Sequence, residues 1–222
     1  MQGIQALTFI YEMDYGVAKL AHELLNSSGD FLTFILKMIT YLGNGGVGFI
    51  VAGVILLLFK KTRIVGFTAL VALLFGSIIT NIALKNIVAR PRPFVDETSD
   101  FYLWWLQAGS LRATSYSFPS GHATAAAAFS VTFFIFYKKK YSWLYLFIPL
   151  VMGFTRVYFN VHFASDVIAG IVVGSLASIG AYYTVKGLQK FEFIQQGLAL
   201  PSITVLLRKD KSAEGGPKVE DK

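Results

Sequence analysis

The sequence alternates between long apolar runs and short clusters of charged residues. Five runs are interpreted as membrane helices, since a helix needs roughly 20 apolar residues to cross the hydrocarbon core. They cover residues 31–59, 64–84, 123–137, 141–159 and 164–183. The first run is longer than one crossing requires and contains the glycine-rich residues 43–46, so we expect a tilted or kinked helix there. The pattern predicts an all-α fold, a polytopic membrane helix bundle with about five spanning helices.

Residues 1–28 carry a weaker pattern, which acidic residues and a lysine interrupt. They lack the basic start of a secretory signal peptide. Their apolar residues lie roughly on one helical face: Ile10, Val17, Leu20, Ala21 and Leu24. We interpret this segment as an N-terminal amphipathic helix at the membrane interface, although a helix packed on the bundle would show the same pattern.

The apolar pattern divides the chain into three parts. They are the N-terminal helix at 1–28, a transmembrane domain at 29–186 and a basic tail at 187–222. The end of the tail, from Ser212, has a composition typical of disorder. A polar and aromatic loop at 90–118 joins the second and third spans. Its aromatic rings suit anchoring at the membrane interface, although they could also line a pocket for a lipid headgroup. These rings belong to Tyr102, Trp104 and Trp105.

Composition supports a membrane protein and excludes several kinds of chemistry. The 222 residues are 55% apolar, and the mean hydropathy is +0.57, which is too high for a soluble domain. The chain has no cysteine, so disulfides, thiol catalysis and thiolate metal sites are excluded. The net charge of +7 could suggest nucleic acid, but the basic residues cluster in short loops between apolar runs. We therefore expect a lipid bilayer, and no nucleic acid, as the partner.

The same basic clusters predict the orientation in the membrane. They lie at 60–63, at 138–140 and from Lys186 onward. With five spans these three sites share one side, which the positive-inside tendency assigns to the cytoplasm. The loops on the other side would then face outward from the cell membrane.

Three polar stretches fall at that outward end. The third stretch runs from 155 to 166 between two apolar runs and contains His162 and Asp166, which share a helical face at a spacing of four. A carboxylate so placed can hold an imidazole in one tautomer and stabilise its cation, although a structural pair capping a membrane helix would look the same. The other two stretches cover residues 85–93 and 118–122.

Together the three stretches concentrate positive charge. Lys85, Arg92 and Arg156 would repel one another unless they surrounded an anion, and phosphate fits the arginine fork and the lysine point charge. Ser120 and Gly121 precede an apolar helical run, whose N-terminal amides can bind phosphate. The alternative is that each cation reaches toward lipid headgroups. That alternative explains one arginine well but explains poorly three cations with two histidines, His122 and His162.

The residues also match three motifs in order. They read as lysine, six residues and Arg-Pro from Lys85; Pro-Ser-Gly-His ending at His122; and arginine, five residues, histidine, three residues and aspartate from Arg156 to Asp166. From about Asp30 to Tyr183 the chain resembles the type-2 phosphatidic acid phosphatase superfamily, which shares its phosphate pocket with vanadium haloperoxidases. Thr155 stands where that family usually has serine, and we expect a small effect on rate or specificity.

The resemblance implies a role for each residue. His162 would be the nucleophile that forms a phosphohistidine, Asp166 would orient it, and His122 would be the general acid and then the general base. The phosphate oxygens would be held by Lys85, Arg92, Ser120, Gly121 and Arg156. Arg90 lies outside the family pattern, and we interpret it as a solvated arginine at the interface.

No metal or other cofactor is expected. A two-metal phosphatase needs several carboxylates close together, whereas the outward face offers few that lack another role. The three cations of the site already supply the charge that a divalent ion would bring.

The predicted function is that of an integral-membrane lipid phosphatase with a phosphorylated membrane lipid as its substrate. It would hydrolyse a phosphomonoester or diphosphate, such as phosphatidate, phosphatidylglycerophosphate or undecaprenyl diphosphate, through a phosphohistidine. Two alternatives remain: a phosphotransferase that uses a lipid diphosphate, and a non-enzymatic phosphate-binding membrane protein.

Overall fold

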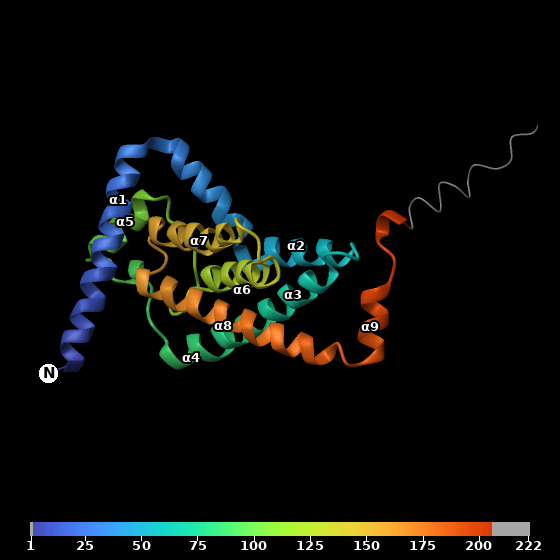
Figure 1. Ribbon diagram of the computed structural model, residues 1–222. Helices are drawn as coiled ribbons and strands as arrows, with labels where there is room; N and C mark the ends of the chain where they lie inside the picture. Colours follow the sequence, from blue (N-terminus) through green and yellow to red (C-terminus); the bar gives the residue numbers. More distant parts are fainter. Residues whose placement is uncertain (1, 206–222) are drawn as a thin grey trace, which may run out of the picture.

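A computed structural model describes residues 2–205, and every regular element in this range is helical (Figure 1). The all-α prediction is therefore confirmed. The elements are α1 (Gln2–Leu42), η1 (Asn44–Gly46), α2 (Val47–Leu57), α3 (Arg63–Ser77), η2 (Ile78–Leu84), α4 (Lys85–Val88), η3 (Pro93–Val95), α5 (Asp100–Gln107), α6 (Gly121–Phe136), η4 (Ser142–Leu146), α7 (Phe147–Tyr158), α8 (Ala164–Leu188) and α9 (Glu192–Ala199). The predicted disorder from Ser212 lies outside the described residues.

Two described helices are long and apolar enough to cross a membrane. One is the continuous helix Arg63–Val88, which joins α3, η2 and α4, and the other is α8. Helices α1 and α2 meet at an angle of 46°, and the pair also qualifies if it is counted as one bent span. Gly45 and Gly46 at this bend have φ of 59° and 72°, so the expected kink is confirmed and has its cause in the glycines. The count of five spans stays a prediction.

Close contact between α6 and α8 organises the bundle. A Cβ atom at Gly170 would lie 2.5 Å from the carbonyl oxygen of Ser120, and one at Gly174 would collide with the carbonyl oxygen of Thr124. Small residues permit this close approach of two membrane helices. As a result the start of α6 lies against the start of α8, where the Ser120 N–H donates to the Asp166 carbonyl at 3.0 Å.

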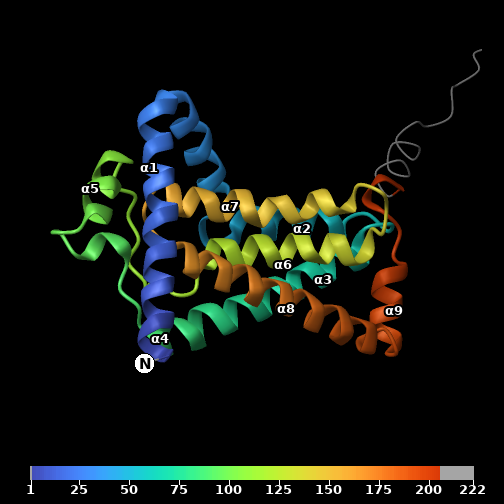
Figure 2. The same ribbon diagram turned by 60° about the vertical axis from the view of Figure 1, so that its left-hand side comes forward.

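Helix α1 breaks at Gly29, whose φ of 68° and ψ of −177° are not helical. Its first half crosses one end of the bundle, transverse to α6, α7 and α8 (Figures 1 and 2). One face, with Ala18 and Ala21, is buried against the bundle, while Leu20 on the other face is 66% exposed. This half of α1 therefore packs on the bundle and also presents an apolar face outward. Its location at the membrane interface stays a prediction.

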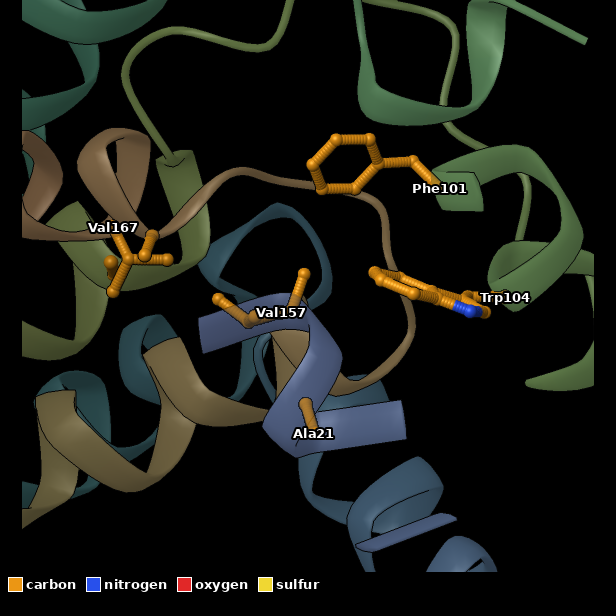
Figure 3. Packing of buried hydrophobic residues seen from close by; sticks show 8 residues of the cluster. Ala21, Phe101, Trp104, Val157 and Val167 are labelled. Carbon is orange, nitrogen blue, oxygen red and sulfur yellow. The ribbon is translucent and has the colours of Figure 1, made fainter. Parts of the chain in front are cut away.

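The loop helix α5 is held against α1 by aromatic packing. Figure 3 shows Trp104 and Phe101 in one cluster with Ala21, Val157 and Val167. Trp104 is only 9% exposed, and its ring stacks on His22 with centroids 5.1 Å apart. The interpretation of Trp104 as a membrane anchor or as the lining of a lipid pocket is therefore wrong, because its ring fills the contact between α5 and α1.

The turn between α2 and α3, the turn after α6 and the end of α8 lie at the opposite end of the bundle from α1 and α5 (Figure 2). These segments carry the described basic residues at 60–63, 138–140 and 186–190. The Arg63 guanidinium donates to four backbone carbonyls around the end of α9, those of Gly197, Leu198, Leu200 and Pro201. These bonds hold the segment after α8 against the turn between α2 and α3. The bundle thus has one end rich in basic residues and another end where the three motifs lie.

Candidate active site

A cavity of about 620 Å³ lies at the motif end of the bundle. The residues that line it come from all three motifs, although these are far apart in the sequence. Six of the eight predicted site residues are among them: Lys85, Arg92, Gly121, His122, Arg156 and His162. The other two, Ser120 and Asp166, are fully buried behind the cavity wall. The structure thus brings the predicted residues together around one space.

His162 and Asp166 form a buried pair. The turn after α7 carries His162, and Asp166 lies in the first turn of α8, with His162 Nδ1 3.5 Å from Asp166 Oδ2. Ser117 connects them, because its hydroxyl donates to Asp166 Oδ2 and lies 3.4 Å from His162 Nδ1. Asp166 Oδ2 also accepts the Phe163 N–H at 3.0 Å. These partners fix the carboxylate, and the carboxylate in turn orients the imidazole.

The tautomer of His162 follows from its partners. Arg92 Nη1 lies 3.1 Å from His162 Nε2, and a guanidinium can only donate, so Nε2 is the acceptor and the proton is on Nδ1. Burial lowers the pKa of His162 to about 3, Arg92 and Arg156 act in the same direction, and the hydrogen bond to Asp166 opposes them. The ring takes up a second proton only at a pH below its pKa. The lowered pKa therefore keeps Nε2 unprotonated and nucleophilic at neutral pH.

Arg92 is held rigidly by backbone carbonyls. Its Nη1 donates to the Val161 carbonyl at 2.6 Å, and its Nε donates to the Ser115 carbonyl at 2.8 Å. Burial lowers the pKa of Arg92 to about 10, which still leaves the guanidinium charged at neutral pH. Lys85 reaches the same loop, because its Nζ donates to Ser115 Oγ at 2.9 Å. The loop before motif two therefore aligns two of the three cations.

Arg156 is positioned by a chain of two threonines. Its Nη1 donates to Thr40 Oγ1 at 2.7 Å, Thr40 Oγ1 lies 2.8 Å from Thr155 Oγ1, and Thr155 Oγ1 donates to the Met152 carbonyl at 2.7 Å. Because Thr155 donates to the carbonyl, it accepts from Thr40. Arg156 Nε is buried without a partner among the described residues. Arg156 itself lines the cavity, and its guanidinium charge favours an anionic ligand there.

The start of α6 combines a helix N-terminus with His122. Ser120 is the N-cap residue, and its hydroxyl accepts the Ala123 N–H at 3.5 Å rather than facing the cavity. Gly121 and His122 follow it and line the cavity. His122 Nε2 lies 3.0 Å from Asn44 Oδ1 in η1, and an amide oxygen only accepts, so Nε2 carries the proton. The direct contact of Ser120 with phosphate stays a prediction.

This arrangement has the chemistry of a site for phosphoryl transfer. An unprotonated imidazole nitrogen lies beside the cations, and a second imidazole with a proton faces the same cavity. Preorganised donors of this kind stabilise charge that develops on phosphate oxygens. Among the described residues, no group of three or more His, Asp or Glu side chains is arranged to hold a metal ion.

Comparison with known proteins identifies the family. The family model described as the PAP2 superfamily matches residues 65–190, which is more than half of the chain. The chain belongs to the PAP2 superfamily. The predicted family, the type-2 phosphatidic acid phosphatases, is thereby confirmed.

Individual PAP2 proteins show the same relationship. The chain is 33% identical to an undecaprenyl-diphosphatase of Sulfolobus acidocaldarius over 56% of this chain and 57% of that protein. It is 33% identical to a lipid A 1-phosphatase of Rhizobium etli over 47% of this chain and 44% of that protein. It thus spans about half the length of these curated relatives. A transmembrane PAP2 phosphatidylglycerolphosphate phosphatase from Bacillus subtilis has the same fold, with a TM-score of 0.56 and 24% identity over 86% of this chain and 88% of the other. These relatives and the apolar helices show a membrane protein.

Several residues of this PAP2 site were not found from the sequence. Ser115 and Ser117 lie in the hydroxyl-rich segment before motif two, while Thr40 and Asn44 lie more than 70 residues from the side chains that they contact. The interpretation of Arg90 as a solvated interfacial arginine is wrong. Its guanidinium bridges the carboxylates of Asp166 and Asp14, and its side chain is 26% exposed.

The first prediction concerns Thr155, where the PAP2 pattern usually has serine. Thr155→Ser keeps the hydroxyl that accepts from Thr40, so we expect kcat/KM within a few-fold of the unchanged protein. Thr155→Val removes it, which leaves the buried Thr40 hydroxyl without its acceptor and loosens the support of Arg156. A buried donor left unpaired costs about 1–3 kcal/mol, so we expect kcat/KM to fall about tenfold. The measurement is the rate of phosphate release from a lipid substrate. Equal rates for the serine and valine variants would show that this chain of hydroxyls does not support Arg156.

Proposed function

We propose that this protein is an integral-membrane lipid phosphatase that works through a phosphohistidine on His162 and needs no metal. The observation that carries the proposal is the state of His162, whose Nδ1 is directed to a buried carboxylate and whose Nε2 is left as an acceptor at the cation-lined cavity. A protein that only binds phosphate needs the cations. It does not need an oriented nucleophile.

The first chemical step transfers the phosphoryl group to the histidine. The substrate phosphate takes the place of His162 Nε2 as a partner of Arg92, which frees the Nε2 lone pair. Nε2 then attacks phosphorus while the bond to the leaving oxygen breaks, and the positive charge on the ring is stabilised by Asp166. The bound phosphate anion favours the doubly protonated form of His122, which gives one of its two protons to the leaving oxygen as general acid and becomes neutral.

The second step releases phosphate. A water molecule takes the position of the departed group, and His122, now without that proton, accepts a proton from it. The resulting hydroxide attacks phosphorus, the bond to Nε2 breaks, and His162 regains its lone pair. Lys85, Arg92 and Arg156 carry the charge of the phosphate oxygens in both steps. These permanent cations supply the charge stabilisation that a divalent ion provides in metal-dependent phosphatases.

The shape of the cavity supports a lipid substrate. Beyond the motif residues it is lined by apolar side chains of α2 and α3, namely Ile50, Leu70, Leu73 and Leu74. A phosphate bound at the cations would place its ester chain along this apolar side, between two helices that face the bilayer. The relatives include an undecaprenyl-diphosphatase and a lipid A 1-phosphatase, so a phosphomonoester or diphosphate of a membrane lipid is the proposed substrate.

We also propose that the site faces outward from the cell membrane in a multi-pass topology. The support is the segregation of charge, because the basic turns lie at the end of the bundle opposite to the motifs (Figure 2). Short basic loops are retained on the cytoplasmic side.

The second prediction tests the two histidine roles. His162→Ala should abolish release of phosphate from phosphatidate, phosphatidylglycerophosphate and undecaprenyl diphosphate, because among the described cavity residues no other imidazole is paired with a buried carboxylate. His122→Ala should slow release most for substrates with poor leaving groups and be partly rescued by an activated aryl phosphate, which needs no proton on departure. The measurement is inorganic phosphate produced by purified protein in detergent micelles. Equal losses on every substrate would contradict the division into nucleophile and acid.

The third prediction tests the topology. Because the chain has no cysteine, Glu97→Cys and Lys139→Cys each introduce one thiol at an exposed position. A membrane-impermeant maleimide added to intact cells should label the thiol at position 97 and leave the one at position 139 unlabelled until the membrane is opened. Labelling of both positions from the same side would contradict the proposed topology.

A further inference from the structure

Arg90 lies between two buried carboxylates from distant parts of the chain. Its Nη1 is 2.7 Å from Asp166 Oδ1, and its Nη2 is 2.8 Å from Asp14 Oδ2. Asp14 is 1% exposed and Asp166 is 0% exposed. Buried charges of this kind are stable only when they are paired and hydrogen-bonded, so each carboxylate depends on the same guanidinium.

Ser165 closes this arrangement into a network. Its hydroxyl accepts from Arg90 Nη1 at 2.7 Å and donates to Asp14 Oδ2 at 2.7 Å, and its backbone N–H donates to Asp14 Oδ1 at 2.7 Å. Asp14 therefore contacts both Arg90 and the first turn of α8, one residue before Asp166. The Arg90 guanidinium also lies over the Phe163 ring, with Cζ 3.9 Å from the centroid, and this contact limits its rotation.

The two oxygens of Asp166 have separate tasks. Oδ1 is held by Arg90, whereas Oδ2 faces Ser117, the Phe163 N–H and His162 Nδ1. The direction of Oδ2 toward the imidazole thus depends on where Oδ1 is held. That position is set by Arg90, and Arg90 is set in turn by Asp14 on helix α1.

We propose that Asp14 is a positioning residue for catalysis, which through Arg90 and Ser165 fixes the Asp166 carboxylate against His162. The first half of α1 is then a working part of the catalytic unit as well as a cover on the bundle. This inference rests on the proposed function, since it assigns a role within that reaction.

The expected effect of the network is on the chemical step. Removing the partner that orients a metal-bound histidine typically costs about 10- to 100-fold in activity, and we expect a similar range for a partner that orients a nucleophilic histidine. Asp14→Asn keeps the size of the side chain and removes the charge that holds Arg90, so kcat should fall on the order of 10- to 100-fold with KM within about twofold. Arg90→Lys keeps the charge but loses the planar fork whose two nitrogens each hold one carboxylate, and it should lower kcat in the same range. The effect of Asp14→Asn should be much smaller in the Arg90→Lys background, because the coupling runs through Arg90.

Vanadate separates positioning from general damage to the fold. Five-coordinate vanadate at His162 Nε2 resembles the transition state, whereas inorganic phosphate resembles the product. Loss of the network should weaken inhibition by vanadate in proportion to the loss of kcat/KM and leave inhibition by phosphate within about twofold. A change in the fold would weaken both inhibitors together.

The experiment uses the full chain, purified in detergent micelles, with phosphate release from a lipid substrate that the unchanged protein turns over. Tyr15→Phe is the matched control, because Tyr15 neighbours Asp14 on α1 and its hydroxyl bonds instead to Asp100 in the loop. This control should keep kcat and both inhibition constants. Arg90→Lys provides the same test if Asp14→Asn does not yield folded protein.

Two outcomes overturn the inference while His162→Ala stays inactive. One is unchanged kcat in Asp14→Asn or in Arg90→Lys. The other is an equal weakening of vanadate and phosphate inhibition. By contrast, turnover that survives in His162→Ala would overturn the proposed function itself, so the two failures can be told apart.

Discussion

Three cations around one cavity repel one another, and this repulsion is the constraint that the rest of the site has to balance. Lys85, Arg92 and Arg156 are all less than 10% exposed, where water screens charge poorly. Each is held by serine and threonine hydroxyls or by backbone carbonyls, while the nearest carboxylate is directed to the imidazole. The site therefore has an unbalanced positive charge at the cavity and favours an anion with several oxygens.

The packing of the helices holds the cations and histidines in place around the cavity. Glycines of α8 let the start of α6 approach the start of α8, and this contact places the N-terminus of α6 beside the histidine turn. The bent α1–α2 segment supplies Thr40 to Arg156 and Asn44 to His122. The first half of α1 crosses the same end and supplies Asp14. The proposed catalytic groups thus come from motifs that lie in short segments of the sequence, but their orientation comes from helices outside those motifs.

This difference explains what the sequence could and could not predict. Lys85, Arg92, His122 and His162 were predictable, because a fixed spacing of reactive residues is visible locally and each lies beside an apolar run. The interpretation of Arg90 as a solvated arginine was wrong, because Arg90 pairs with Asp14, which lies 76 residues away. Such a pairing appears only in the folded chain. A signal was nevertheless present. Asp14 shares a helical face with Ala18 and Ala21, so the spacing placed an acid on a face of small residues suited to burial.

The measurement that tests the central claim most directly is the trapping of the phosphoenzyme. Purified protein with His122→Ala should form the intermediate on an activated aryl phosphate and hydrolyse it slowly. After a rapid quench in excess EDTA, we expect mass spectrometry to find one phosphoryl group on the peptide that contains His162, stable in alkali and labile in acid. Absence of the phosphopeptide when the aryl group is released, or its formation only when a divalent metal is restored, would contradict the account.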